Sequence, residues 1–171
     1  LGRQIGLDVG NYATSRVTAE LGLAMLFTRL GLALDEQRQP QKGLLFARIA
    51  TWLAPSSDAA KLGLAELMDR QDLDTKASAL LKGIAPNSPF WVQAVVNQTQ
   101  LVATPEESVA IARAASEAQP ASSQLKLLYA QTLELADRRD LAVTVYRSLL
   151  DQDAGGTNGA RRAVYLLLLA T

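Results

Sequence analysis

Apolar residues recur three or four positions apart along most of this 171-residue chain, as in Leu26, Leu30 and Leu34. That interval places them on one face of an α-helix, with polar residues on the other face. No segment alternates with the two-residue period of a half-buried strand. The pattern predicts an all-α protein built from amphipathic helices.

Prolines divide the helical segments into units of similar length. Pro55, Pro86 and Pro120 are separated by 31 and 34 residues, and such spacing is typical of arrays in which each unit holds two helices. Pro40 and Pro105 lie 65 residues apart, which is one shorter plus one longer unit. We therefore expect each of them to open a second helix, where a missing N–H costs nothing. The shorter interval predicts that the second helix near 74–83 lacks about one turn.

Local capping signals mark two of the helix starts. Thr104-Pro105-Glu106-Glu107 is a capping box with proline at the first helical position, and Ser88-Pro89 offers the same N-cap and proline. We expect helices to begin at both places.

One register accounts for the small residues. The chain divides into an N-terminal segment and helix extension (1–23), four helix-pair repeats (24–57, 58–88, 89–122 and 123–154), and a glycine-rich loop with the start of a further helix (155–171). The eighth and twentieth positions of the four repeats are Gly31, Ala65, Val96, Ala130, Gly43, Ala77, Ser108 and Ala142. All but Val96 are Gly, Ala or Ser, which lets paired helices approach closely.

The best-patterned repeats are the first and the last. The first carries Phe27, Leu30, Gly31, Leu34, Gly43, Ala50 and Pro55, and the last carries Tyr129, Ala130, Leu133, Ala142, Tyr146 and Leu149. This pattern resembles the tetratricopeptide repeat (TPR), over residues 24–154, with departures at Lys61, Val96 and Thr99. The resemblance implies an α-solenoid of antiparallel helix pairs in a right-handed superhelix. It also implies a non-catalytic segment of a larger bacterial multi-repeat protein that binds a protein or peptide.

In that family, the first helices of successive pairs line a concave surface that contacts the partner. Carried over to this sequence, the resemblance gives Met25, Thr28, Asp35, Glu66, Asp69, Phe90, Gln93, Asn97, Gln100, Gln124, Gln131 and Glu134 as partner-binding residues. This surface has four carboxylates and no Lys or Arg, so we expect a neutral or basic peptide rather than a clamp for a C-terminal carboxylate. Gln93, Asn97 and Gln100 form an amide stripe at helical spacing. The alternative is that this stripe is only the solvated side of an amphipathic helix.

Composition removes most catalytic chemistry. The chain has no Cys and no His, which excludes the common zinc sites, thiol nucleophiles and Ser-His relays. Lys plus Arg and Asp plus Glu both number 17, so no nucleic-acid partner is expected. We expect no enzyme activity, no cofactor and no metal at Asp69, Asp72 and Asp74, which lack the form of a calcium loop. Trp52 and Trp91 are expected in the core.

Other interpretations remain open. The segment could be a spacer that forms homo-oligomers through its end helices, or a glycan-cleaving enzyme with Glu66 or Glu134 as its acid. The apolar run 164–170 is far shorter than the roughly 20 residues that span a bilayer, so no membrane insertion is expected. The start has no initiator Met and no signal-peptide pattern, which is expected of a piece of a longer protein. The compartment is left open between bacterial cytoplasm and periplasm.

Overall fold

The computed structural model describes residues 19–153, and within them it contains α-helices and no strand. The helices are α1 (Ala19–Glu36), α2 (Pro40–Leu53), α3 (Asp58–Asp69), α4 (Asp74–Lys82), α5 (Trp91–Leu101), α6 (Pro105–Ala118), α7 (Ser123–Leu135) and α8 (Arg139–Asp153). The all-α prediction is confirmed. The expected glycine-rich loop and further helix in 155–171 lie outside the described residues, as does most of the N-terminal segment.

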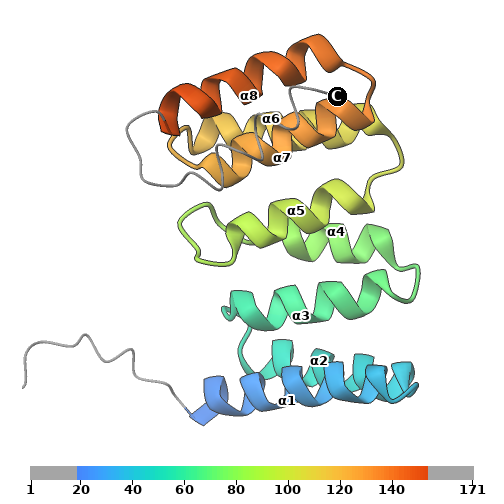
Figure 1. The fold of residues 1–171 in the computed structure, drawn as a ribbon. Coiled ribbons are helices and arrows are strands. Elements are labelled where there is room, and N and C mark those ends of the chain that lie inside the picture. The colour runs from blue at the N-terminus through green and yellow to red at the C-terminus, as the bar shows by residue number, and fades with distance from the viewer. Residues whose placement is uncertain (1–18, 154–171) are drawn as a thin grey trace, which may run out of the picture.

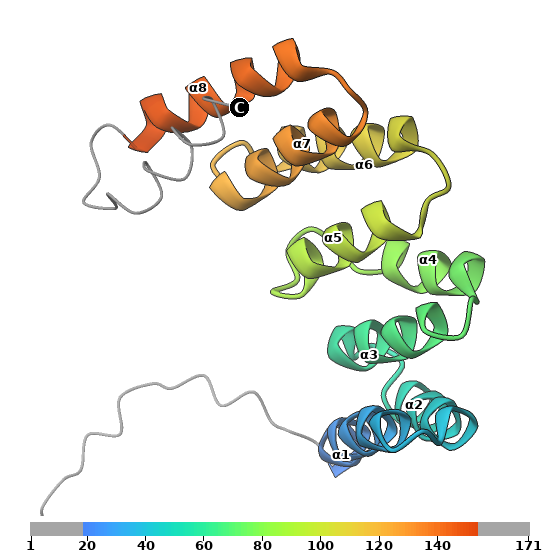
Figure 2. The same ribbon diagram turned by 45° about the vertical axis from the view of Figure 1, so that its right-hand side comes forward.

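The helices stack as successive pairs into an α-solenoid, as predicted. Figure 1 shows α1 and α2 at one end of the stack and α7 and α8 at the other. Each odd-numbered helix packs against the helix that follows it, and α2, α4 and α6 also pack against the next odd-numbered helix. The contacts of α1 with α3, α3 with α5 and α5 with α7 join the odd-numbered helices into one surface. In the turned view, α1, α3 and α5 follow one another along one side of α2 and α4 (Figure 2).

The small residues at the predicted crossings are buried. All seven Gly, Ala and Ser residues of that set are buried, whereas Val96, the larger exception, is half-buried. Thr99, another departure from the pattern, is also buried, and its C=O accepts a hydrogen bond from Ser108 Oγ at 2.6 Å. A side chain–backbone hydrogen bond therefore joins α5 and α6 where apolar packing is expected.

Helix starts agree with the capping signals in one case and differ in the other. Thr104 Oγ1 accepts from the Glu107 N–H, and α6 begins at Pro105 as predicted. The expected start at Pro89 is wrong, because α5 begins at Trp91. The Trp91 N–H first donates to the Ser88 C=O at 3.1 Å, which closes a tighter turn before the helix. The α-helical bonding that follows includes the Ala94 N–H donating to the Phe90 C=O at 3.0 Å.

The turn within a pair is the same in three pairs. Arg38, Asp72 and Asp137 have left-handed φ angles of 60°, 55° and 57°. In each case the N–H of the following residue donates to the C=O five residues earlier, at 2.8–2.9 Å. This pattern is the Schellman motif that ends a helix. It requires one residue in the left-handed conformation, which Asp adopts more readily than most residues.

The second helix of the second pair is short. α4 has 9 residues, against 14 in α2 and 14 in α6. This is the shortening that the 31-residue proline interval predicts. It also leaves the space beside the end of α4 incompletely filled.

The two tryptophans have opposite environments. Trp91 is buried in the main core, as predicted. Trp52 is 78% exposed, so its predicted place in the core is wrong. The buried face of α2 includes Ala50, and Ala54 just after the helix is buried too. Trp52 lies two residues from each of them, about 200° round the helix, and therefore points away from the core.

Among the described helices, none combines the length and apolar content that crossing a membrane requires.

Candidate functional site

A polar groove lies between α3 and α5 on the surface that the odd-numbered helices form. Its volume is about 320 Å³, and it is lined by Leu62, Glu66, Asp69, Arg70, Gln93, Asn97 and Gln100. Five of the twelve residues expected to bind a partner meet here, two from α3 and three from α5. Helical spacing explains this, because intervals of three and four residues put each set on one face of its helix.

Two side chains of the amide stripe of α5 are hydrogen-bonded to each other. Gln93 Nε2 donates to Asn97 Oδ1 at 2.8 Å. This fixes the two side chains along the helix and leaves the Gln93 carbonyl and the Asn97 NH₂ as one acceptor and one donor group for a ligand. The Gln100 amide makes no hydrogen bond within residues 19–153, so it adds a further donor and acceptor.

Arg70 corrects the expectation of a groove without cations. It caps the C-terminal end of α3, and its guanidinium donates to Asp35 Oδ2 at 2.7 Å and to Glu66 Oε1 at 2.6 Å. The hydrogen bond to Asp35 is the main cause of its raised pKa, and Glu66 adds to it. Sequence reasoning missed Arg70 because it follows the last family contact position of the repeat, although its four-residue spacing from Glu66 was a usable signal.

The charge around Arg70 stays negative. Asp35, Glu66 and Asp69 contribute three carboxylates against the one guanidinium, which leaves a formal charge of minus two. Asp35 lies on α1 and its side chain is only 12% exposed. Arg70 therefore bridges α1 and α3 and also lines the groove.

Of the residues expected from α1, Met25 and Thr28 do not join this groove, and Asp35 reaches it only through its ion pair with Arg70. Met25 is exposed on α1. Thr28 is half-buried, and its hydroxyl donates to the Ala24 C=O at 2.8 Å. Its methyl group lies over Gly63, where an added Cβ would come within 2.5 Å. Thr28 thus packs α1 on α3 rather than facing a partner, because the glycine leaves room for it.

Of the other residues expected from α5 and α7, some are exposed and one is bonded within the fold. Phe90 is 37% exposed at the start of α5, and Gln124 and Gln131 are exposed on α7. Glu134 instead accepts a hydrogen bond from the hydroxyl of Tyr146 at 3.0 Å. Tyr146 is fully buried, and burial together with the Glu134 carboxylate raises its pKa. Glu134 therefore holds α7 and α8 together.

The two carboxylates considered as catalytic acids are both engaged. Glu66 accepts from Arg70 and Glu134 accepts from Tyr146. Over the described residues, no group of three or more His, Cys, Asp or Glu side chains is arranged to hold a metal ion.

Solved structures with a similar fold include two TPR proteins. YrrB, described as a TPR protein with an unusual peptide-binding site, superposes with a TM-score of 0.51 and 14% identity over 83% of this chain and 75% of its own. TTC0263, a thermophilic TPR protein of Thermus thermophilus, superposes with a TM-score of 0.50 and 16% identity over 86% of this chain and 100% of its own. No protein-family model and no curated protein matches the sequence. The chain therefore has a TPR-like α-solenoid fold.

Proposed function

We propose that this chain is a non-catalytic interaction scaffold that holds an extended, neutral or basic peptide in the groove between α3 and α5. The observation that carries this proposal is the meeting of Glu66, Asp69, Gln93, Asn97 and Gln100 around one hollow.

The chemistry of the groove suits a peptide backbone. An extended backbone presents alternating N–H and C=O groups, and the amides of Gln93, Asn97 and Gln100 can donate and accept along it. Leu62 provides an apolar contact on the opposite wall. A preorganised pair such as Gln93 and Asn97 loses less side-chain entropy on binding.

The charge of the groove selects the peptide. Arg70 is already bonded to two carboxylates, so the net charge that a ligand meets is negative. Basic side chains are attracted to such a surface and acidic ones are repelled. The peptide-binding site of YrrB, a protein of the same fold, adds support at the level of fold.

The test is selection from a displayed library of unstructured peptides, followed by titration of the selected peptides. The paired substitution Gln93→Ala with Asn97→Ala should weaken binding at least tenfold, a loss of about 1.4 kcal/mol. A matched control is Gln41→Ala with Gln152→Ala, which removes two exposed helical amides outside the groove. Unchanged binding after the groove substitutions, or equal loss in the control, refutes the groove as the site.

Exposed apolar residues on the first helix pair favour a second function, self-association as a spacer. Leu23, Leu26 and Leu30 on α1 and Leu45 and Trp52 on α2 are all exposed. A spacer that associates through this end should show a concentration-dependent mass by light scattering. The mass should become that of a monomer after Leu26→Glu with Trp52→Glu, whereas peptide binding in the groove should be unaffected.

A further inference from the structure

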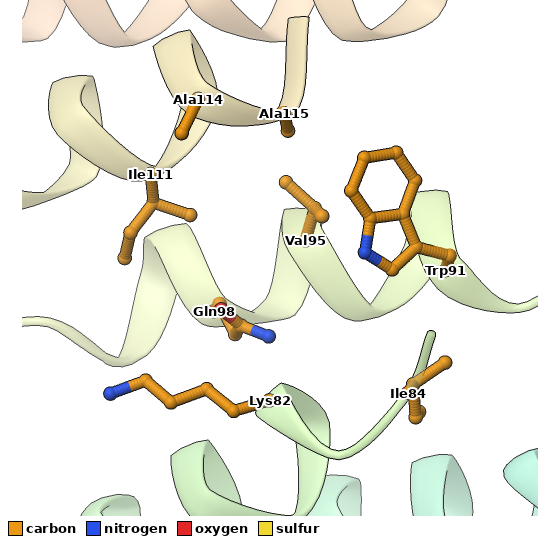
Figure 3. Close-up of a pocket in the computed structure, with 8 residues that line it drawn as sticks. All are labelled: Lys82, Ile84, Trp91, Val95, Gln98, Ile111, Ala114 and Ala115. Carbon is orange, nitrogen blue, oxygen red and sulfur yellow. The ribbon is translucent and has the colours of Figure 1, made fainter. Parts of the chain in front are cut away.

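The short helix α4 leaves a second pocket, of about 290 Å³, bounded by the end of α4, α5 and α6 (Figure 3). Its walls are mainly apolar and include Ile84, Trp91, Val95 and Ile111. α2 and α6 are each five residues longer than α4, which is more than one helical turn. The missing turn is the one that would extend α4 beyond Lys82 and cover this space.

The pocket is separate from the groove between α3 and α5. Trp91, Val95 and Gln98 recur at intervals of four and three residues along α5, two positions out of phase with the amide stripe of the groove. Two residues correspond to about 200° of rotation, so the two sets lie on nearly opposite faces of α5. A ligand here would not compete directly with a peptide in the groove.

Gln98 is the unusual residue of the pocket. It is only 9% exposed, yet its side-chain amide makes no hydrogen bond within residues 19–153. Figure 3 shows it in the middle of the pocket, between Lys82 and Trp91. Buried amides are normally hydrogen-bonded to protein or to water, because an unpaired one costs free energy. The arrangement therefore leaves room for a polar partner beside Gln98.

The polar groups that reach the pocket are mostly donors. The Trp91 indole N–H and the Lys82 ammonium also make no hydrogen bond in the described part of the chain, and no Asp or Glu lines the pocket. Gln98 can donate two hydrogen bonds, Lys82 three and Trp91 one, against the single acceptor oxygen of Gln98. Lys82 also offsets the partial negative charge at the C-terminal end of α4. The complementary ligand is an anionic acceptor attached to an apolar body.

We propose that this pocket binds a small apolar monocarboxylate, with the carboxylate at Lys82 and Gln98 and the apolar group between Ile84, Trp91 and Val95. A water molecule takes about 30 Å³ of liquid volume, so the pocket accommodates roughly ten non-hydrogen atoms. Phenylacetate has this size and chemistry and serves as the probe. A ligand of that size in an open pocket should bind in the roughly millimolar range.

The fluorescence of Trp91, which lines the pocket, can be used to measure binding. The chain has two tryptophans, and Trp52→Phe removes the exposed one and leaves Trp91 as the reporter. In this background, phenylacetate titrated into the full chain should change the Trp91 fluorescence in a saturable manner. The neutral phenylacetamide and the cationic phenethylamine have nearly the same shape and should bind at least tenfold more weakly.

Substitutions locate the binding. Lys82→Met and Gln98→Leu should each weaken phenylacetate binding roughly tenfold, since each removes a donor to a charged group while keeping its apolar atoms. Ala114→Leu should abolish binding by filling the pocket from its rim. Lys42→Met is the control and should change nothing, because this lysine lies on α2, away from the pocket, and donates to Gln39.

Several outcomes overturn the proposal. They are the absence of a saturable Trp91 signal, equal binding of the three probes, or binding that survives both Lys82→Met and Ala114→Leu. Because Gln98 is buried, circular dichroism must show that Gln98→Leu is folded. Lys82 and Ala114 are exposed, so their substitutions decide the question even if Gln98→Leu is not folded.

Discussion

A Cβ atom added to Gly31 would lie 2.8 Å from the carbonyl oxygen of Gly43, and one added to Gly43 would lie 2.7 Å from the carbonyl oxygen of Gly31. The two glycines therefore set the distance between α1 and α2 backbone to backbone. Backbone atoms within packed helices cannot rotate away as a side chain can. Any larger residue at either position must push the helices apart.

We predict that Gly31→Ala destabilises the protein although alanine favours helix more than glycine by about 1 kcal/mol. The forced separation should outweigh this gain and lower the free energy of unfolding by about 1–3 kcal/mol, measured by urea denaturation. Gly83→Ala is a milder comparison: its added Cβ would lie 3.3 Å from the Leu80 carbonyl oxygen, which requires a shift of only a few tenths of an ångström, so a smaller loss of stability is expected.

The contact between Gly31 and Gly43 also predicts that the effects of substituting them on the free energy of unfolding are not additive. Once Gly31→Ala has separated the helices, Gly43→Ala should cost less than it does alone, so the double variant should lose less than the sum of the single losses. A strictly additive result, or a stabilised Gly31→Ala, contradicts the proposed contact.

Arg70 predicts a smaller and salt-dependent effect. Arg70→Gln removes the ion pairs with Asp35 and Glu66 and should lower the free energy of unfolding by up to about 1 kcal/mol. The loss should shrink as salt is added, because exposed pairs are screened. Arg113→Gln breaks a pair with Glu117 in which both side chains are more than 60% exposed, and should be nearly neutral. Equal effects of the two substitutions would mean that the link from Arg70 to α1 contributes nothing.

Much of the fold could be predicted because its signals are local. Apolar spacing, prolines and a capping box report on helices, and the recurring small residues report on where paired helices cross. The short α4 was also visible as a missing turn in the proline interval. Each of these depends on residues close in sequence or on a repeat that displays the same contact several times.

The side chains at the site were less predictable because they depend on neighbours distant in sequence. Thr28 is taken up by a contact with Gly63, and Glu134 by one with Tyr146. Arg70 lines the groove, and its long side chain also reaches Asp35 on another repeat. Position within a repeat fixes the helix face of a residue, but not which partner from the next repeat occupies its polar atoms.

Substitutions of the two tryptophans test that Trp91 lies in the core and Trp52 does not. Trp52→Gln should change the free energy of unfolding by less than about 0.5 kcal/mol, as expected of an exposed position. Trp91→Ala should cost about 3 kcal/mol or more, because it empties a buried site. If Trp52→Gln proves as costly as Trp91→Ala, Trp52 is covered in solution by another surface, and its effect should then depend on protein concentration.

Tyr146 predicts the behaviour of the protein in alkali. Burial first, and the Glu134 carboxylate second, raise the pKa of its phenol above the unfolded value of about 10. The folded state therefore holds the proton more tightly than the unfolded state. The resulting stabilisation is complete below about pH 10 and is lost as the pH rises toward the folded pKa.

We predict that the free energy of unfolding, measured by urea denaturation at a series of pH values, falls more steeply above about pH 10 in the native protein than in Tyr146→Phe. At pH 7 the variant should be less stable by about 1 kcal/mol, because it loses the hydrogen bond to Glu134. Tyr129→Phe is the matched control, since the Tyr129 hydroxyl makes no hydrogen bond among the described residues, and it should keep the steep alkaline slope. Parallel slopes for native protein and Tyr146→Phe would show that the phenol is not sequestered between α7 and α8 in solution.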